Sequence, residues 1–155
     1  MTADVMTSFV AFLHHLAAFT LVGALVAELA LTTDELATKR ARTIFFADLA
    51  YGISASTILV IGLLRAIYFE KGTSYYFHSV PFLAKASLFL VVGLLSIYPT
   101  VEFLSWRTSL KQGQAPIIMA RKLRTIRSII RLELTGVVLI LLCAALMANG
   151  VGYFG

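Results

Sequence analysis

The stretch from Pro81 to Ser105, PFLAKASLFLVVGLLSIYPTVEFLS, is the clearest indication of the fold of this chain. It is apolar along nearly its whole length and contains only two charged residues, Lys85 and Glu102. Hydrocarbon about 30 Å thick is crossed by about 20 helical residues, and this stretch exceeds that length. We therefore expect it to form one transmembrane helix.

Three further stretches have the same character, namely Ser8–Leu31, Thr43–Phe69 and Thr125–Gly150. Hydrophobic residues make up 59% of the 155-residue chain and charged residues 14%, whereas soluble domains contain about 25% charged residues. The sequence therefore predicts a single all-α membrane domain over residues 1–155. The expected architecture is an antiparallel four-transmembrane-helix bundle, in which short loops make consecutive helices neighbours.

The distribution of basic residues predicts the orientation of the bundle in a bacterial inner membrane. Outside the first and third loops and their edges, the connecting segments and termini contain only Lys71. Positively charged loops stay cytoplasmic, so we expect both termini on the periplasmic side. The net charge of +5 is explained by this topology and does not indicate nucleic-acid binding. The basic residues concerned are Lys39, Arg40, Arg42, Arg107, Lys111, Arg121, Lys122, Arg124 and Arg127.

Two segments have alternative interpretations. The end of the third loop, Ile117–Arg127, is either a solvated basic segment, which we favour, or an amphipathic helix on the anionic inner leaflet. The second helix carries small residues on the face of Asp48, which include Gly52 and Ala55. Small residues let membrane helices approach closely, so this face indicates packing in the bundle, a homodimer interface or clearance for a flat cofactor.

Ionisable residues within the spans are the main indication of function, because a charged group near the bilayer centre costs on the order of 3 kcal/mol. Counted by helical rise, one layer lies about 6–10 Å below the outer surface. It contains His14, His15, Arg65 and Lys85. A second layer near the cytoplasmic side contains Glu28, Asp48, Glu102, Arg131 and Glu133.

The outer layer suggests a haem site. A proximal histidine commonly ligates haem iron, and Arg65 and Lys85 are suited to hold propionate groups. His14 and Glu28 are 14 residues apart, so they return to within about 40° of one helix face, whereas His15 is offset from His14 by about 100°. The simpler interpretation of each histidine is a hydrogen-bonded polar residue, and His78 is either a second ligand or an interfacial residue.

The inner layer has three interpretations. We favour ion pairs between its acids and arginines, with Arg42, Arg107, Arg127 and Arg131 as candidates. A carboxylate-bridged metal site is less favoured, because the Glu-x-x-His pairs of di-iron bundles are absent. A path for protons or cations is the third interpretation, since intramembrane charges commonly mark such routes.

Two motifs carry a resemblance to HemJ-type membrane protoporphyrinogen oxidases. They are Phe12-Leu-His-His-Leu-Ala in the first helix and Phe82-Leu-Ala-Lys-Ala-Ser-Leu in the third. The chain is still more similar to a family of small four-helix bacterial inner-membrane proteins of unassigned function, through Asp48-Leu-Ala-Tyr-Gly, Gly62-Leu-Leu-Arg65 and Tyr98-Pro-Thr-Val-Glu102-Phe-Leu-Ser-Trp106.

The HemJ resemblance implies haem b, with His15 as the axial ligand, His14 as its competitor and Lys85 as a residue needed for activity. The Pro-Arg pair that this family has near the end of its first helix is missing here, in the region of Leu29. Its absence weakens the expectation of a porphyrinogen substrate more than the expectation of haem binding. The sequence thus favours a haem-b inner-membrane oxidoreductase that exchanges electrons with a quinone or a porphyrinogen. A proton- or cation-handling transport component is the alternative, and an assembly factor with structural ion pairs is the simplest interpretation.

Overall fold

The computed structural model describes residues 2–33, 36–64 and 80–152, and these residues contain helices and no strands. Four of the helices are long and apolar enough to cross a membrane, which confirms the predicted four-helix membrane bundle. The helices are α1 (Thr2–Leu31), α2 (Thr38–Leu64), α4 (Val80–Ser105), the short α5 (Arg107–Lys111) and α6 (Ala120–Ala148).

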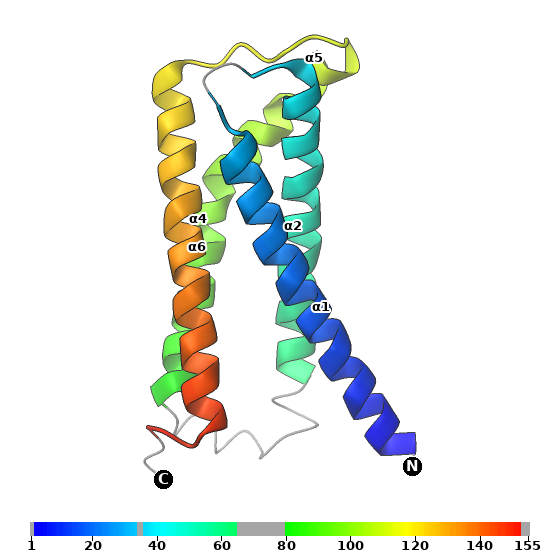
Figure 1. Ribbon diagram of the computed structural model, residues 1–155, viewed down its shortest axis with the longest axis vertical. Coiled ribbons are helices and arrows are strands. Elements are labelled where there is room, and N and C mark those ends of the chain that lie inside the picture. Colours follow the sequence, from blue (N-terminus) through cyan, green and yellow to red (C-terminus); the bar gives the residue numbers. More distant parts are fainter. Residues whose placement is uncertain (1, 34–35, 65–79, 153–155) are drawn as a thin grey trace.

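The four long helices run alternately in opposite directions, as expected (Figure 1). Both chain termini lie at one end of the bundle, which we call the terminal end. The other end carries the α1–α2 connection, α5 and the α5–α6 connection (Figure 1). We call it the basic end, because Lys39, Arg40 and Arg42 lie in the first turns of α2, Arg107 and Lys111 lie in α5, and Arg121, Lys122 and Arg124 lie in the first turns of α6.

The helices pack as two pairs. α1 packs mainly on α2, α4 packs mainly on α6, and α1 also contacts α6, whereas α2 contacts α4 much less. The prediction that consecutive helices are neighbours is therefore confirmed for α1 and α2 and only weakly met for α2 and α4. After the α1–α2 pair, the most extensive helix contact joins α4 to α6. These two helices are adjacent in space although the longest described connection lies between them in the sequence.

A glycine on α6 permits the close packing of α4 on α6. Gly136 is buried on α6, and a Cβ atom built there would overlap Cγ2 of Val92 on α4. Val92 is itself 5% exposed, so it has little room to move. Gly136 therefore lets the two helices approach at this level, as small residues do in membrane bundles.

The buried core lies mainly in the half of the bundle toward the basic end. Trp106 is 3% exposed and packs edge-on against Phe103, with ring centroids 4.8 Å apart. The fully buried side chains of this core include Leu25, Ile44, Phe103, Ile126 and Ile130. The basic end is thus the tightly packed half of the molecule.

The third connection consists of α5 and an irregular segment before Ala120. Neither interpretation of Ile117–Arg127, the solvated loop or the helix on the membrane surface, holds from Ala120 onward, because these residues form the first turns of α6 and bury Leu123 and Ile126 in the bundle. Gly113 and Gly150 end α5 and α6 in the left-handed conformation, with φ of 72° and 71°. Each has the two backbone hydrogen bonds of a Schellman motif, such as Val151 N–H to Leu146 O at 3.1 Å.

Candidate functional site

Three acidic side chains from three helices meet inside the bundle. Glu28 on α1 is 2% exposed, Asp48 on α2 is 7% exposed and Glu133 on α6 is 1% exposed. Glu28 interacts electrostatically with both other carboxyl groups, and Glu133 interacts with Asp48. These three residues form what we call the acidic cluster.

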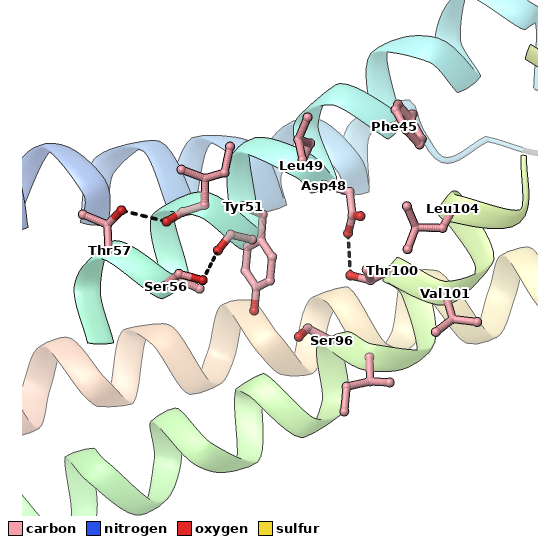
Figure 2. Close-up of a pocket in the computed structure, with 14 residues that line it drawn as sticks. Phe45, Asp48, Leu49, Tyr51, Ser56, Thr57, Ser96, Thr100, Val101 and Leu104 are labelled. Atoms are coloured by element: carbon pink, nitrogen blue, oxygen red, sulfur yellow. Dashed lines mark hydrogen bonds between the residues drawn. The ribbon is translucent and has the colours of Figure 1, made fainter. Parts of the chain in front are cut away.

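The acidic cluster has few polar partners. Thr100 on α4 donates a hydrogen bond from Oγ1 to Oδ1 of Asp48 at 2.7 Å (Figure 2). Oε1 of Glu28 and Oε1 of Glu133 are buried and have no hydrogen-bond partner among the described residues. A buried carboxyl oxygen without a partner is costly, so these atoms need a proton, water or a cation.

The predicted ion pairs with Arg42, Arg107 and Arg131 are not formed by the acidic cluster. The ion pair described within residues 2–33, 36–64 and 80–152 joins Lys122 to Glu102 and includes none of its three carboxyl groups. Arg42 instead donates to the Leu110 carbonyl at 3.4 Å, and Arg107 and Arg131 are exposed. Arg131 lies two residues before Glu133, which places the two side chains about 200° apart around the helix.

Glu102, the remaining member of the predicted inner layer, does form an ion pair. Lys122 at the start of α6 lies 2.6 Å from Oε2 of Glu102, and 49% of the Lys122 side chain is exposed. Glu102, whose side chain is 15% exposed, therefore pairs with the start of α6 and is not part of the acidic cluster. The predicted inner layer is divided among the buried cluster, this ion pair and the exposed Arg131.

Tyr51 extends the acidic cluster along α2. It is 5% exposed, lies about one turn after Asp48 and interacts electrostatically with all three acids. Its hydroxyl group points toward Ser96 on α4 (Figure 2). Tyr51 and Thr100 belong to two motifs of the four-helix family quoted above, but neither they nor Ser96 were predicted as site residues. Their spacing relative to Asp48 along the two spans is regular, but the sequence does not reveal that these helix faces oppose each other.

A groove of about 700 Å³ runs between α2 and α4, where these two helices are least in contact. Its apolar walls are strongly exposed, with Ile53 at 61% and Val101 at 61%, so in a membrane the groove faces the acyl chains. Its polar lining is formed by Asp48, Tyr51, Ser56, Thr57, Ser96 and Thr100 (Figure 2).

The small residues of α2 line this groove. Gly52 and Ala55 are both part of its wall, and a Cβ atom built at Gly52 would meet nothing within 4 Å. The small-residue face of Asp48 is therefore not closed by another described helix. Asp48 and Tyr51 border both the groove and the acidic cluster, so the two features form one continuous candidate site.

Three members of the predicted outer layer, His14, His15 and Lys85, lie on described helices. His15 is exposed, and its Nδ1 lies 2.6 Å from the Ala11 carbonyl oxygen. The His14 ring is partly buried, with its centroid 6.2 Å from that of His15. Lys85 is partly buried, with Nζ 5.9 Å from the centroid of the Phe82 ring. α1 packs on α2 and α6, and α4 packs on α6, so the histidines and Lys85 lie on helices that do not pack closely together.

Two predicted residues, Arg65 and His78, lie outside the described residues. In the part of the chain that the structure describes, no three His, Cys, Asp or Glu side chains are grouped closely enough to hold a metal ion. The α2–α4 groove has no histidine in its lining, and neither does a smaller groove beside Arg42 and Arg107. Of the two predicted axial ligands, His14 is the one whose ring is partly buried.

Comparison with known proteins identifies the family. A family model described as "Predicted membrane protein (DUF2214)" matches residues 6–152. No curated protein and no solved structure matches the chain. The chain therefore belongs to this family of membrane proteins, and the prediction of a membrane family is confirmed in that general form.

Proposed function

We propose that this member of the DUF2214 family is a proton- or cation-handling component of the membrane, with the acidic cluster as its working site. The observation that carries the proposal is the burial of Glu28, Asp48 and Glu133 together, without a basic partner among the described residues. Packing alone does not account for three acids on three helices, since apolar side chains of similar size would fill the same space without a desolvation cost.

The physical argument is one of charge compensation. Each unpaired carboxylate removed from water loses several kcal/mol of solvation, and three neighbouring negative charges also repel one another. The cluster must therefore be neutralised by protons or by a cation whenever it is buried. Protons suit it better than a tightly bound metal ion, because the described residues include no group of metal-binding side chains with the required proximity.

In this proposal, protons or cations pass between the basic end of the bundle and the groove through the acidic cluster. Glu28 lies one turn before the end of α1 at the basic end, and Thr32, which is 2% exposed, continues from it and bonds to its carbonyl group. Asp48 and Tyr51 connect the cluster to the groove. In this proposal the basic end faces the bacterial cytoplasm, following the positive-inside rule, and the two termini face the periplasm.

Proton flux into proteoliposomes tests this function. Asp48→Asn and Glu133→Gln should each reduce the flux strongly, because an amide keeps the shape of the side chain but cannot carry a proton. Glu102→Gln is the matched control, since this acid is paired with Lys122 at the surface, and its flux should equal that of the wild type. Equal flux in all four proteins, with unchanged helical content, would falsify the proposal.

Haem-dependent electron transfer is the second candidate, and the specific observation in its favour is the partly buried His14, whose Nδ1 atom is inaccessible to solvent. His14 would supply the axial ligand and Lys85 a charge for propionates, while His15 is the ligand that the HemJ resemblance favours. Haem would supply one-electron chemistry toward a quinone or a porphyrinogen.

Absorption spectra of the purified protein, oxidised and then reduced, test this candidate. If His14 ligates haem, His14→Ala should abolish the Soret band, whereas His15→Ala, which changes an exposed ring, should retain it. A protein without a Soret band after haem supplementation would eliminate haem-based redox chemistry, and it would leave the proton-handling proposal unaffected.

A further inference from the structure

We propose that the smaller groove at the basic end, between the start of α2 and α5, binds the phosphate group of an anionic phospholipid such as phosphatidylglycerol. We call it the basic groove. It has a volume of about 310 Å³ and is lined by Arg42, Phe45, Phe46, Arg107, Leu110 and Lys111. This inference goes beyond the proposed function, because the acidic cluster takes no part in it.

Three cations from two segments that are distant in the sequence converge on the basic groove. Arg107 and Lys111 are four residues apart on α5, so they lie on one face of that helix, one turn apart. α5 lies beside the first turns of α2 (Figure 1). From there, Arg42 donates a hydrogen bond from Nη2 to the Leu110 carbonyl oxygen at 3.4 Å. This bond holds the Arg42 guanidinium beside the residue that precedes Lys111.

The positive charge of the basic groove is not balanced by an acid in its wall. The six described residues of its lining include no Asp or Glu. The ion pair that the structure describes joins Lys122 to Glu102 and involves none of the three cations. A guanidinium has five N–H donors, and Arg42 uses one of them on the Leu110 carbonyl. Since arginine donates parallel pairs of hydrogen bonds to phosphate oxygens, this cluster is suited to a phosphate group.

The basic groove lies at the expected boundary between hydrocarbon and head groups. Arg42 directly precedes the predicted span Thr43–Phe69, and Arg107 follows the predicted span Pro81–Ser105 by two residues. In the proposed orientation the basic end faces the cytoplasm, where the inner leaflet contains anionic lipids. Basic pockets between membrane helices on that side bind anionic lipid head groups. The phosphate of such a lipid is therefore at the right depth to reach the three cations.

Exposed apolar side chains lie on the membrane side of the cations. Phe45 and Phe46 follow Arg42 by three and four residues, so they lie about one helical turn deeper, and their ring centroids are 5.7 Å apart. On α4, Leu104 precedes Arg107 by three residues. Phe46 is 58% exposed and Leu104 is 52% exposed. A phosphate that carries acyl chains uses both levels of this surface, whereas a soluble anion would use only the cations.

Titration of the detergent-purified protein with phosphatidylglycerol, followed by native mass spectrometry, tests the proposal. The wild type should bind one phosphatidylglycerol about tenfold more tightly than phosphatidylcholine with the same acyl chains, because the choline group is positively charged. Arg107→Gln combined with Lys111→Gln removes two of the three charges and should weaken phosphatidylglycerol binding by about tenfold. Phe46→Ala, which shortens an exposed apolar side chain, should weaken it severalfold.

Arg121→Gln combined with Arg124→Gln is the matched control. Both residues are exposed in the first turns of α6, and neither lines the basic groove. Their replacement therefore removes the same charge from the same end of the bundle. The phosphatidylglycerol affinity of this variant should equal that of the wild type. Equal losses of affinity in the two double variants, with unchanged helical content, would overturn the proposal, because they would indicate a diffuse basic surface.

Two other results would also overturn it. Equal affinities of the wild type for phosphatidylglycerol and phosphatidylcholine would mean that the groove does not select an anionic head group. Displacement of the lipid by inorganic phosphate at the same concentration would mean that the ligand is a soluble anion. Glu133→Gln separates this inference from the proposed function, because it should reduce proton flux and leave phosphatidylglycerol affinity unchanged.

Discussion

Replacing Gly136 by alanine should destabilise the bundle through a single steric contact. The added Cβ atom would overlap Cγ2 of Val92, and Val92 is almost fully buried at 5% exposure. Overpacking of a tight interface costs about 1–3 kcal/mol, whereas alanine gains up to about 1 kcal/mol over glycine in a helix. We therefore expect a net loss of about 1–2 kcal/mol in the free energy of unfolding.

The assay is reversible unfolding in mixed detergent micelles with increasing dodecyl sulfate, followed by circular dichroism. Gly93→Ala on α4 is the control, because a Cβ atom built at Gly93 meets nothing within 4 Å. That variant should be as stable as the wild type or slightly more stable. Both variants gain the same helix propensity from alanine. The difference between their free energies of unfolding therefore measures the steric cost of the added Cβ atom at Gly136.

A double-mutant cycle sharpens the prediction. Val92→Ala removes the methyl group that the new Cβ atom would meet, so the pair Gly136→Ala and Val92→Ala should be more stable than the sum of the single costs predicts. Contacting residues show coupling energies of about 0.5–3 kcal/mol. Strict additivity, or a Gly136→Ala protein as stable as Gly93→Ala, would refute the close approach of α4 and α6 at this level.

Two further predictions concern polar contacts. Thr100→Val removes the donor to Asp48 and should lower the free energy of unfolding by about 1 kcal/mol, near the value typical of hydrogen bonds in membrane bundles; an unchanged midpoint in the same unfolding assay would contradict the bond. Lys122→Met breaks an exposed ion pair with Glu102, and such pairs contribute little. Its unfolding midpoint should match that of the wild type at both low and high salt, and a clear salt-dependent loss would contradict this prediction.

Hydropathy was sufficient to predict the fold, because a bilayer demands long apolar helices and excludes most other backbone structures. The predicted span Pro81–Ser105 differs from α4 by one residue at its start. The other helices begin several residues earlier than predicted, at Thr2, Thr38 and Ala120. Their polar first turns extend beyond the hydrocarbon, so hydropathy does not detect them.

Helical rise groups residues by expected depth but does not give the direction of a side chain around the helix axis. Of the four acids expected in one layer, Glu28, Asp48 and Glu133 are at most 7% exposed, whereas Glu102 pairs with Lys122 at the start of α6. Which face of a helix is buried depends on the helices that pack against it. Loop lengths predict neither the pairing of α4 with α6 nor the weak contact between α2 and α4 that leaves the groove open.

Helical phase nevertheless distinguishes the two histidines once one buried residue on α1 is known. Glu28 is buried, and the 14-residue separation places His14 within about 40° of its face; His14 is indeed partly buried and His15 is exposed. The HemJ resemblance favours His15 as the haem ligand, whereas helix geometry favours His14. A haem bound through His15 would therefore require either a second chain that covers the outer face of α1 or a rotation of α1. Rotation would also turn Glu28, which is 2% exposed, out of the bundle, so it is incompatible with a buried acidic cluster.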